Sequence, residues 1–176
     1  MTEAVKKNGV TFGVILGIVS VLITAGIYAT DVTNFVNWML GIGIFVISLT
    51  ILIIAVAKAK KAQEGYITFK EAFTTYFIAA AIGAGIATLF NIILFNVIDP
   101  AAKEIVTEET INMSVEWMQK AGSSSDDIRK IVEEARKTDS FGTVSLIKNY
   151  FFGLLFHIIL GLIVAAAFKK NKPEFV

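Results

Sequence analysis

His157 is the residue in this chain best suited to do chemistry inside an apolar segment, and it is the single histidine among 176 residues. It lies in a run, residues 149–168, that contains no Asp, Glu, Lys or Arg. Burial in lipid disfavours a charged imidazole, and the neutral ring has one donor and one acceptor to satisfy. A hydrogen bond to a neighbouring helix is the ordinary explanation of such a residue. A role in binding a proton or a ligand is the alternative.

Asn91 is the predicted hydrogen-bond partner of His157. It lies about 7 residues before Ile98, the last residue of another uncharged run, residues 72–98. His157 lies about 8 residues after Asn149, the first residue of its own run, and both of these ends are expected on the same side of the membrane. At about 1.5 Å of rise per residue, the two side chains are expected at similar depths in a membrane. Polar pairs of this kind between membrane helices contribute about 0.6–2 kcal/mol.

The residue types in this chain give little support for any other catalytic site, cofactor site or metal site. The chain has no cysteine, which excludes thiol catalysis and thiolate metal sites, and one histidine alone cannot build an ordinary zinc site. No acidic residue lies near His157 in the sequence, as a nucleophile–His–acid arrangement would require. The acidic pairs Glu108-Glu109 and Asp126-Asp127 lack the spacing of a calcium-binding loop. We therefore expect no catalytic residue, no cofactor and no metal.

The elements that must position these side chains are four long uncharged segments. Hydrophobic residues make up 55% of the chain and the mean hydropathy is +0.69, more than a soluble domain of this size needs. The segments cover residues 9–30, 35–57, 72–98 and 149–168, and about 20 residues suffice to cross a hydrocarbon core of about 30 Å. The sequence predicts one all-α membrane domain over residues 1–176, a four-helix bundle.

The third segment is the one around which we expect the others to pack. Thr68 and Glu71 match the capping-box pattern, so this helix is predicted to begin near Phe69. Small residues recur every fourth position in this segment and in two others, a spacing that lets helix backbones approach closely in lipid. The residues predicted to lie at helix contacts are Gly9, Gly13, Gly17, Ala79, Gly83, Ala87, Gly153 and Gly161.

Residues 99–142 are predicted to form a helical hairpin outside the membrane. Asp99 and Pro100 give a strong helix start. Residues 122–125, Gly-Ser-Ser-Ser, separate this helix from a second one that residues 124–127, Ser-Ser-Asp-Asp, can cap. The first helix carries a stripe at helical spacing, formed by Val106, Thr110, Met113, Trp117 and Ala121. The hairpin holds ten acidic and six basic side chains, a net formal charge of −4.

Charge asymmetry predicts how the chain sits in the membrane. The N-terminal segment, the connection of residues 58–70 and the C-terminal tail are basic, whereas the turn at Asp31 and the hairpin are acidic. The positive-inside rule then places both termini in the cytoplasm. The lysines of residues 58–61 could instead bind anionic lipid or nucleic acid, but the overall charge of +1 indicates no nucleic-acid partner.

The chain resembles a known family in the stripe GVTFGVILG of residues 9–17, the stretch GYITFKEAF of residues 65–73, and the polar helical insert before the last segment. This family is an uncharacterised four-span bacterial inner-membrane family of the Bacteroidetes type, domain of unknown function 4199. GYITFKEAF is the most specific part of the resemblance, which covers nearly the whole chain. It implies a four-helix protein of the bacterial cytoplasmic membrane, and it transfers no activity and no functional residue.

The leading functional hypothesis is a non-enzymatic scaffold or accessory subunit that binds other membrane proteins or itself within the lipid bilayer. The alternative is a small transporter or permeation protein with His157 and Asn91 on its path. The uncharged spans argue against ion-coupled transport, and an enzyme is the third hypothesis. A pull-down that preserves the membrane and a flux measurement in proteoliposomes distinguish the first two.

Overall fold

The computed structural model describes residues 2–172, and residues 173–176 of the basic tail lie outside the described part. The described residues form six α-helices, one 3₁₀ helix (η1) and one π-helical turn (η2). In chain order these are α1 (Glu3–Thr30), η1 (Val32–Val36), α2 (Trp38–Lys61), α3 (Phe69–Ile93), η2 (Leu94–Ile98), α4 (Pro100–Lys120), α5 (Ser125–Lys137) and α6 (Thr143–Phe168).

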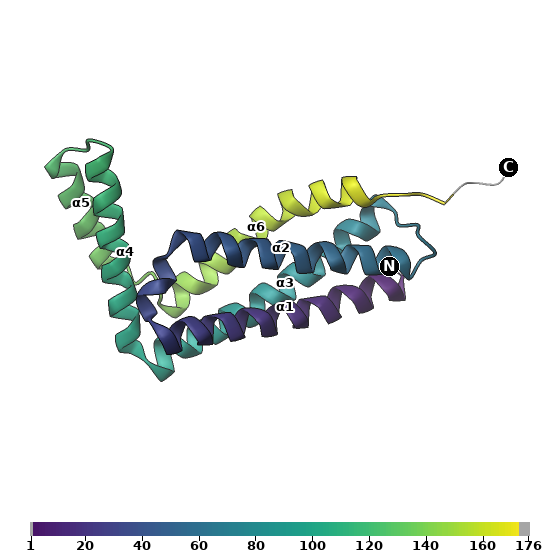
Figure 1. Cartoon of the computed structure of the whole chain (residues 1–176), viewed down its shortest axis with the longest axis horizontal. Coiled ribbons are helices and arrows are strands. Elements are labelled where there is room, and N and C mark those ends of the chain that lie inside the picture. Colours follow the sequence, from purple (N-terminus) through teal and green to yellow (C-terminus); the bar gives the residue numbers. More distant parts are fainter. Residues whose placement is uncertain (1, 173–176) are drawn as a thin grey trace.

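Four of these helices are long and apolar enough to cross a membrane: α1, α2, α6 and the continuous segment formed by α3 and η2. They lie side by side as an elongated bundle, with α4 and α5 at one end (Figure 1). The predicted all-α fold, with four apolar helices and a helical hairpin before the last of them, is confirmed. The protein is a multi-pass integral membrane protein.

The predicted capping residues form hydrogen bonds at the starts of their helices. The Glu71 amide donates to Thr68 Oγ1 over 3.2 Å and the Thr68 amide donates to Glu71 Oε2 over 2.9 Å, which completes the capping box of α3. The Ala102 amide donates to the Asp99 side chain at the start of α4. These bonds satisfy amides that a helix leaves without internal partners.

Helix α3 is the centre of the bundle, because it packs against α1, α2 and α6. Its longest contacts are with α1 and α6, whereas α2 and α6 touch each other only over a short stretch. The main core lies between the helices near the end that holds the start of α1 and the end of α6, and includes Leu52, Tyr76 and Ala80 at 0% exposure. The prediction that the other three apolar segments pack around the third is confirmed.

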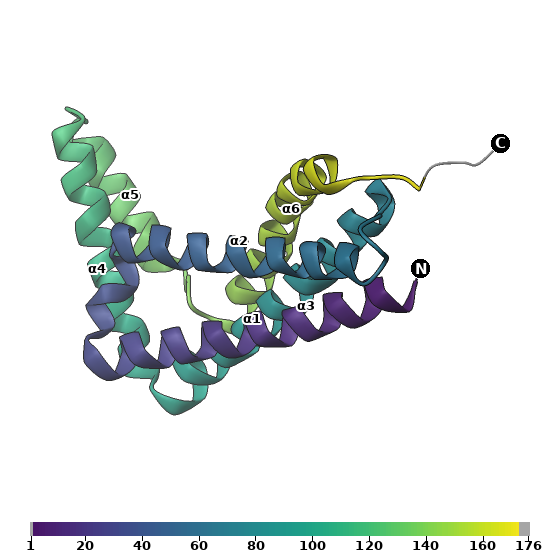
Figure 2. The same ribbon diagram turned by 45° about the vertical axis from the view of Figure 1, so that its right-hand side comes forward.

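A second, smaller core joins the bundle to the hairpin. Phe95 of η2 and Val106 of α4 are buried there, and Tyr28, Phe35 and Phe141 pack against them. From this junction α4 runs steeply across the direction of the bundle, and its far half extends past the bundle edge (Figures 1 and 2). The hairpin therefore lies crosswise over one end of the spanning helices.

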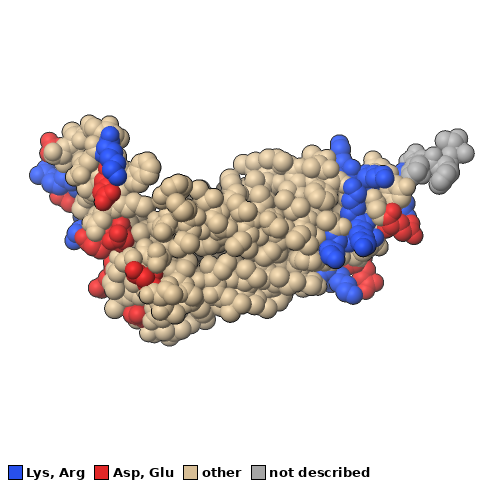
Figure 3. All heavy atoms as spheres, in the orientation of Figure 1, with Lys and Arg blue, Asp and Glu red and all other residues tan. Residues whose placement is uncertain are grey.

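Charged side chains gather at the two ends of the molecule and leave a long uncharged middle on the face shown in Figure 3. The end that carries the N-terminus has a belt of basic groups, and the opposite end carries the mixed charges of the hairpin (Figure 3). An uncharged band between two charged ends is the surface expected of a protein that crosses a bilayer.

Candidate functional site

A contact between two polar side chains joins α3 to α6 in the main core. The Tyr76 hydroxyl of α3 lies 3.1 Å from Nδ1 of His157 on α6. Tyr76 is fully buried at 0% exposure, and its ring centroid lies 6.0 Å from that of His157. With a neutral imidazole protonated on Nε2, the Tyr76 hydroxyl donates and Nδ1 of His157 accepts, so the hydroxyl donor and the Nδ1 acceptor satisfy each other.

Asn91 is not the partner of His157, contrary to the sequence-based pairing. Its side-chain amide donates to the Ala87 carbonyl of its own helix over 2.9 Å, an internal bond that a short polar side chain on a helix forms readily. Part of the error in the depth estimate is that α6 begins at Thr143 rather than at the predicted residue 149, which places His157 about 9 Å deeper along its helix than the count assumed. Tyr76 lies about 22 Å deeper along α3 than Asn91, so the rest of the difference comes from how α6 lies against α3.

Tyr76 is the functional candidate that sequence reasoning missed. A tyrosine in an uncharged run carries a polar hydroxyl that needs a partner when buried, and this was the available signal. Close approach of the two helices follows from Gly161 of α6, which is buried. A β-carbon at Gly161 would lie 2.9 Å from Cδ1 of Tyr76 and 3.2 Å from Cε2 of Phe73. Gly161 thus occupies a helix contact, as the sequence predicted.

The glycine stripe of α1 packs against α3. A β-carbon at Gly9, Gly13 or Gly17 would lie 2.6–2.9 Å from side-chain atoms of Ile78, Ile82 or Ile86, respectively. On the α3 side Ala79 and Gly83 are buried, and Leu16 of α1 covers Gly83. Ala87 is half-buried. The two predicted small-residue stripes are therefore largely one interface inside the chain, and each lets the other backbone approach.

Gly153 does not lie at a helix contact within the described chain, contrary to its prediction. It is exposed, and a β-carbon there would meet nothing within 4 Å. Gly41 and Gly43 of α2 are open in the same way. Spacing alone therefore could not reveal which glycines face a neighbouring helix.

Two of the grooves at the end that holds the N-terminus differ in charge. One, of about 420 Å³, lies between α1 and α2, and its basic lining residues are Lys7, Lys58 and Lys61, with no carboxylate in the lining. The other, of about 520 Å³, mixes lysines and glutamates, and Lys172 Nζ lies 3.2 Å from Glu64 Oε2. The first groove is electropositive, a property that suits an anionic membrane surface.

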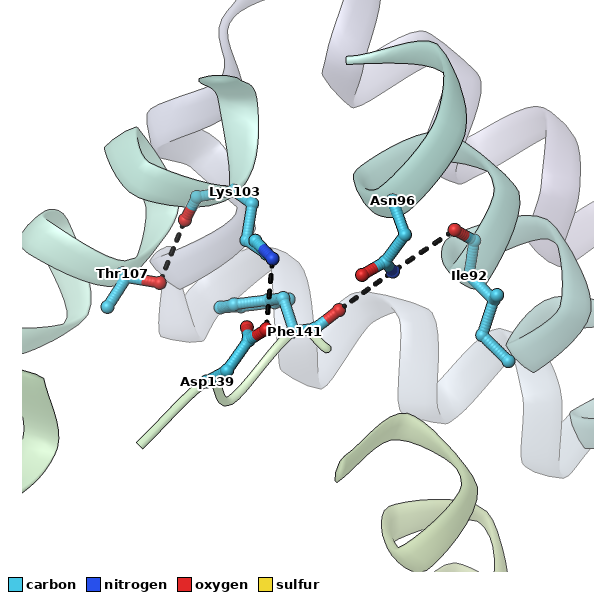
Figure 4. Close-up of polar contacts among 6 residues, drawn as sticks. All are labelled: Ile92, Asn96, Lys103, Thr107, Asp139 and Phe141. Atoms are coloured by element: carbon cyan, nitrogen blue, oxygen red, sulfur yellow. Dashed lines mark hydrogen bonds and ion pairs between the residues drawn. The ribbon is translucent and has the colours of Figure 1, made fainter. Parts of the chain in front are cut away.

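At the opposite end a polar network fixes the base of the hairpin. Asn96 of η2 donates to the carbonyls of Ile92 and Phe141, each over 3.1 Å. The Lys103 ammonium lies 3.0 Å from Asp139 Oδ2 (Figure 4). These contacts tie the π-helical turn and α4 to the segment that leads into α6, so the hairpin is held at both of its ends.

The turn between α1 and α2 carries an ionised carboxylate. The Thr33 amide and the Thr33 hydroxyl donate to Asp31 Oδ1 over 2.9 and 2.8 Å. These hydrogen bonds, the backbone one first, hold the pKa of Asp31 below its ordinary value of 3.8. Asp31 therefore stabilises the turn in its charged form.

Comparison with known proteins gives a family but no described activity. No curated protein and no solved structure matches the chain significantly. The family model described as "Protein of unknown function (DUF4199)" matches residues 11–170. That match includes most of α1, the other three apolar helices and the hairpin, and the chain accordingly belongs to this family.

Proposed function

We propose that this protein is a non-enzymatic membrane subunit that binds another membrane protein, or a second copy of itself, through the outward faces of α2 and α6. The observation that carries the proposal is the placement of Gly41, Gly43 and Gly153, where an added β-carbon would meet no atom of another helix in the described chain within 4 Å. Glycine costs helix stability relative to alanine. Open glycines on membrane helices suit the close approach of another helix.

The faces around these glycines are apolar and uncovered. Phe45 of α2 and Phe152 of α6 are 41% and 73% exposed, as lipid-facing side chains also are. Phe45 and Phe156, whose ring centroids lie 6.2 Å apart, mark where the two helices meet. A partner helix that packs between α2 and α6 would gain small residues on both sides and aromatic rings at its centre.

The bilayer is proposed to be the bacterial cytoplasmic membrane, with both termini in the cytoplasm. The support is the basic belt at the end that carries the N-terminus, together with the net negative hairpin at the other end.

The test is a pull-down of the tagged chain from its native membrane in a lipid-preserving polymer. We expect a reproducible membrane partner or a dimer, lost on Gly153→Leu and retained on Gly26→Leu. Gly26 also has open space around it but lies on α1, so it controls for bulk alone. Recovery of a monomer with no partner contradicts the proposal.

A small transporter is the second candidate, and the Tyr76–His157 contact inside the bundle is the observation that favours it. None of the five described grooves is lined by either residue, and Asn91 is bonded to its own helix. Solute flux in proteoliposomes that is abolished by His157→Ala would support this candidate over the first.

A further inference from the structure

We propose that the C-terminal half of α4 lies on the surface of the bilayer, with Trp117 inserted among the phospholipid headgroups. The proposal concerns the hairpin and goes beyond the function suggested for α2 and α6. It starts from the stripe on α4. The first residue of the stripe, Val106, is buried against the bundle, whereas the last two, Trp117 and Ala121, are exposed.

The inner part of the stripe defines which side of α4 faces the membrane. Val106 is 0% exposed and packs in the junction core with Leu94 and Phe95 of the third spanning segment. Trp117 follows Val106 by eleven residues, which is about three helical turns at about 3.6 residues per turn. Trp117 therefore points to the same side as Val106, about 16 Å further along the helix.

Beyond the bundle edge this side of α4 has no protein cover in the described chain. Trp117 is 64% exposed, and the space-filling view shows an open notch between the hairpin and the flank of the bundle (Figure 3). Because α4 runs crosswise to the spanning helices (Figures 1 and 2), that notch is where the outer lipid leaflet must lie.

Helix α5, the second helix of the hairpin, does not pack against the side of α4 that carries Val106 and Trp117. Arg136 of α5 pairs with Glu108 over 2.7 Å, and Ile111 lines the groove between α4 and α5. Glu108 and Ile111 lie on roughly the opposite side of α4 from Val106. Helix α5 thus packs on the far side of α4, and α4 separates it from the lipid.

The level of the stripe matches the membrane interface. Met113 and Glu116 of α4 line one groove together with Trp38, the first residue of the spanning helix α2. Trp38 is 63% exposed, and tryptophan is favoured at the headgroup level of membranes. Trp117 lies one turn beyond Met113, so both tryptophans are at the same interface. The hairpin's charge of −4 favours zwitterionic over anionic headgroups.

The experiment uses the two tryptophans of the chain. In phosphatidylcholine nanodiscs, Trp38→Phe leaves Trp117 as the fluorophore. The matched control is the Trp38→Phe, Trp117→Phe, Gln119→Trp variant, because Gln119 is exposed and lies on roughly the opposite side of α4. We expect nitroxide-labelled lipid to quench the fluorescence of Trp117 at least about twofold more than that of the control variant. Aqueous iodide should quench the control variant more than Trp117.

Two outcomes overturn the proposal. Equal quenching of both positions by iodide places the stripe in water. Protection of Trp117 from both quenchers places protein, such as a second copy, over the stripe. Because the chain has no cysteine, a nitroxide attached at Trp117→Cys gives an independent measure through its accessibility to oxygen and to a water-soluble nickel complex. Preferential accessibility to nickel contradicts the insertion.

Discussion

At the scale of single residues, the side chains of Tyr76 and His157 form a polar contact that links two spanning helices. Its environment is apolar and Tyr76 is fully buried, so loss of either partner leaves the other without its hydrogen bond. Leaving a buried polar group unpaired costs more than the net value of the bond itself.

We expect Tyr76→Phe and His157→Ala each to lower the free energy of unfolding in detergent, with a coupling of about 0.6–2 kcal/mol in a double-mutant cycle. The same cycle between Asn91→Ala and His157→Ala should give no coupling, because Asn91 bonds within its own helix. Additive effects for Tyr76 and His157 would dismiss the contact.

Asp31 gives a prediction for pH dependence. Its pKa is lowered in the folded state by the Thr33 amide and hydroxyl. The stability it contributes is therefore present above its ordinary value of 3.8 and is lost as the pH falls through the lowered folded value. Asp31→Asn keeps a side-chain oxygen that accepts these bonds but does not titrate.

The difference in thermal midpoint between the wild-type protein and Asp31→Asn should accordingly shrink in acid, between about pH 5 and about pH 2. Scanning calorimetry in an acid-stable detergent measures both midpoints. A difference that stays constant over this range would show that the charge of Asp31 does not stabilise the turn.

At the scale of the helices, the α1–α3 interface depends on missing side chains. A β-carbon at Gly13 would lie 2.8 Å from Cβ of Ile82 and 3.0 Å from the Ala79 carbonyl oxygen. Neither neighbour can move without shifting a helix backbone. Overpacking of this kind costs about 1–3 kcal/mol.

Gly13→Ala should therefore lower stability by about that amount. Gly26→Ala on the same helix meets nothing within 4 Å, and it should be neutral or stabilising by up to about 1 kcal/mol because alanine favours the helix. Thermal unfolding of both variants in one detergent measures the contrast. Equal midpoints would mean that α1 and α3 are not held this closely.

At the scale of the whole molecule, the two charged ends predict a fixed orientation. Lys130 of α5 and Lys61 of α2 lie at opposite ends and are both exposed. Since the chain has no cysteine, a single cysteine at either position reports its own side of the membrane.

In intact bacterial spheroplasts, Lys130→Cys should react with a membrane-impermeant thiol reagent, and Lys61→Cys should react only after lysis. A reporter fused after residue 176 should be active in the cytoplasm. Labelling of Lys61→Cys before lysis would reverse the topology that the positive-inside rule predicts.

The sequence alone determined the features that depend on neighbours along the chain. Four uncharged runs could be identified because a helix that crosses lipid must be apolar over about 20 residues. The helix starts at Thr68, Asp99 and Ser124 followed from residues within one turn of each cap. None of these features requires knowledge of how one helix lies against another.

The tertiary structure decided every contact between helices. Gly13 and Gly153 both lie in runs of small residues four positions apart, but a β-carbon at Gly13 would meet α3, whereas one at Gly153 would meet no other helix of the described chain within 4 Å. Likewise His157 meets Tyr76 instead of Asn91, because a shift of a few residues along one helix exchanges all of its partners. Depth and rotation are properties of a helix pair, and a periodic pattern in one helix leaves both undetermined.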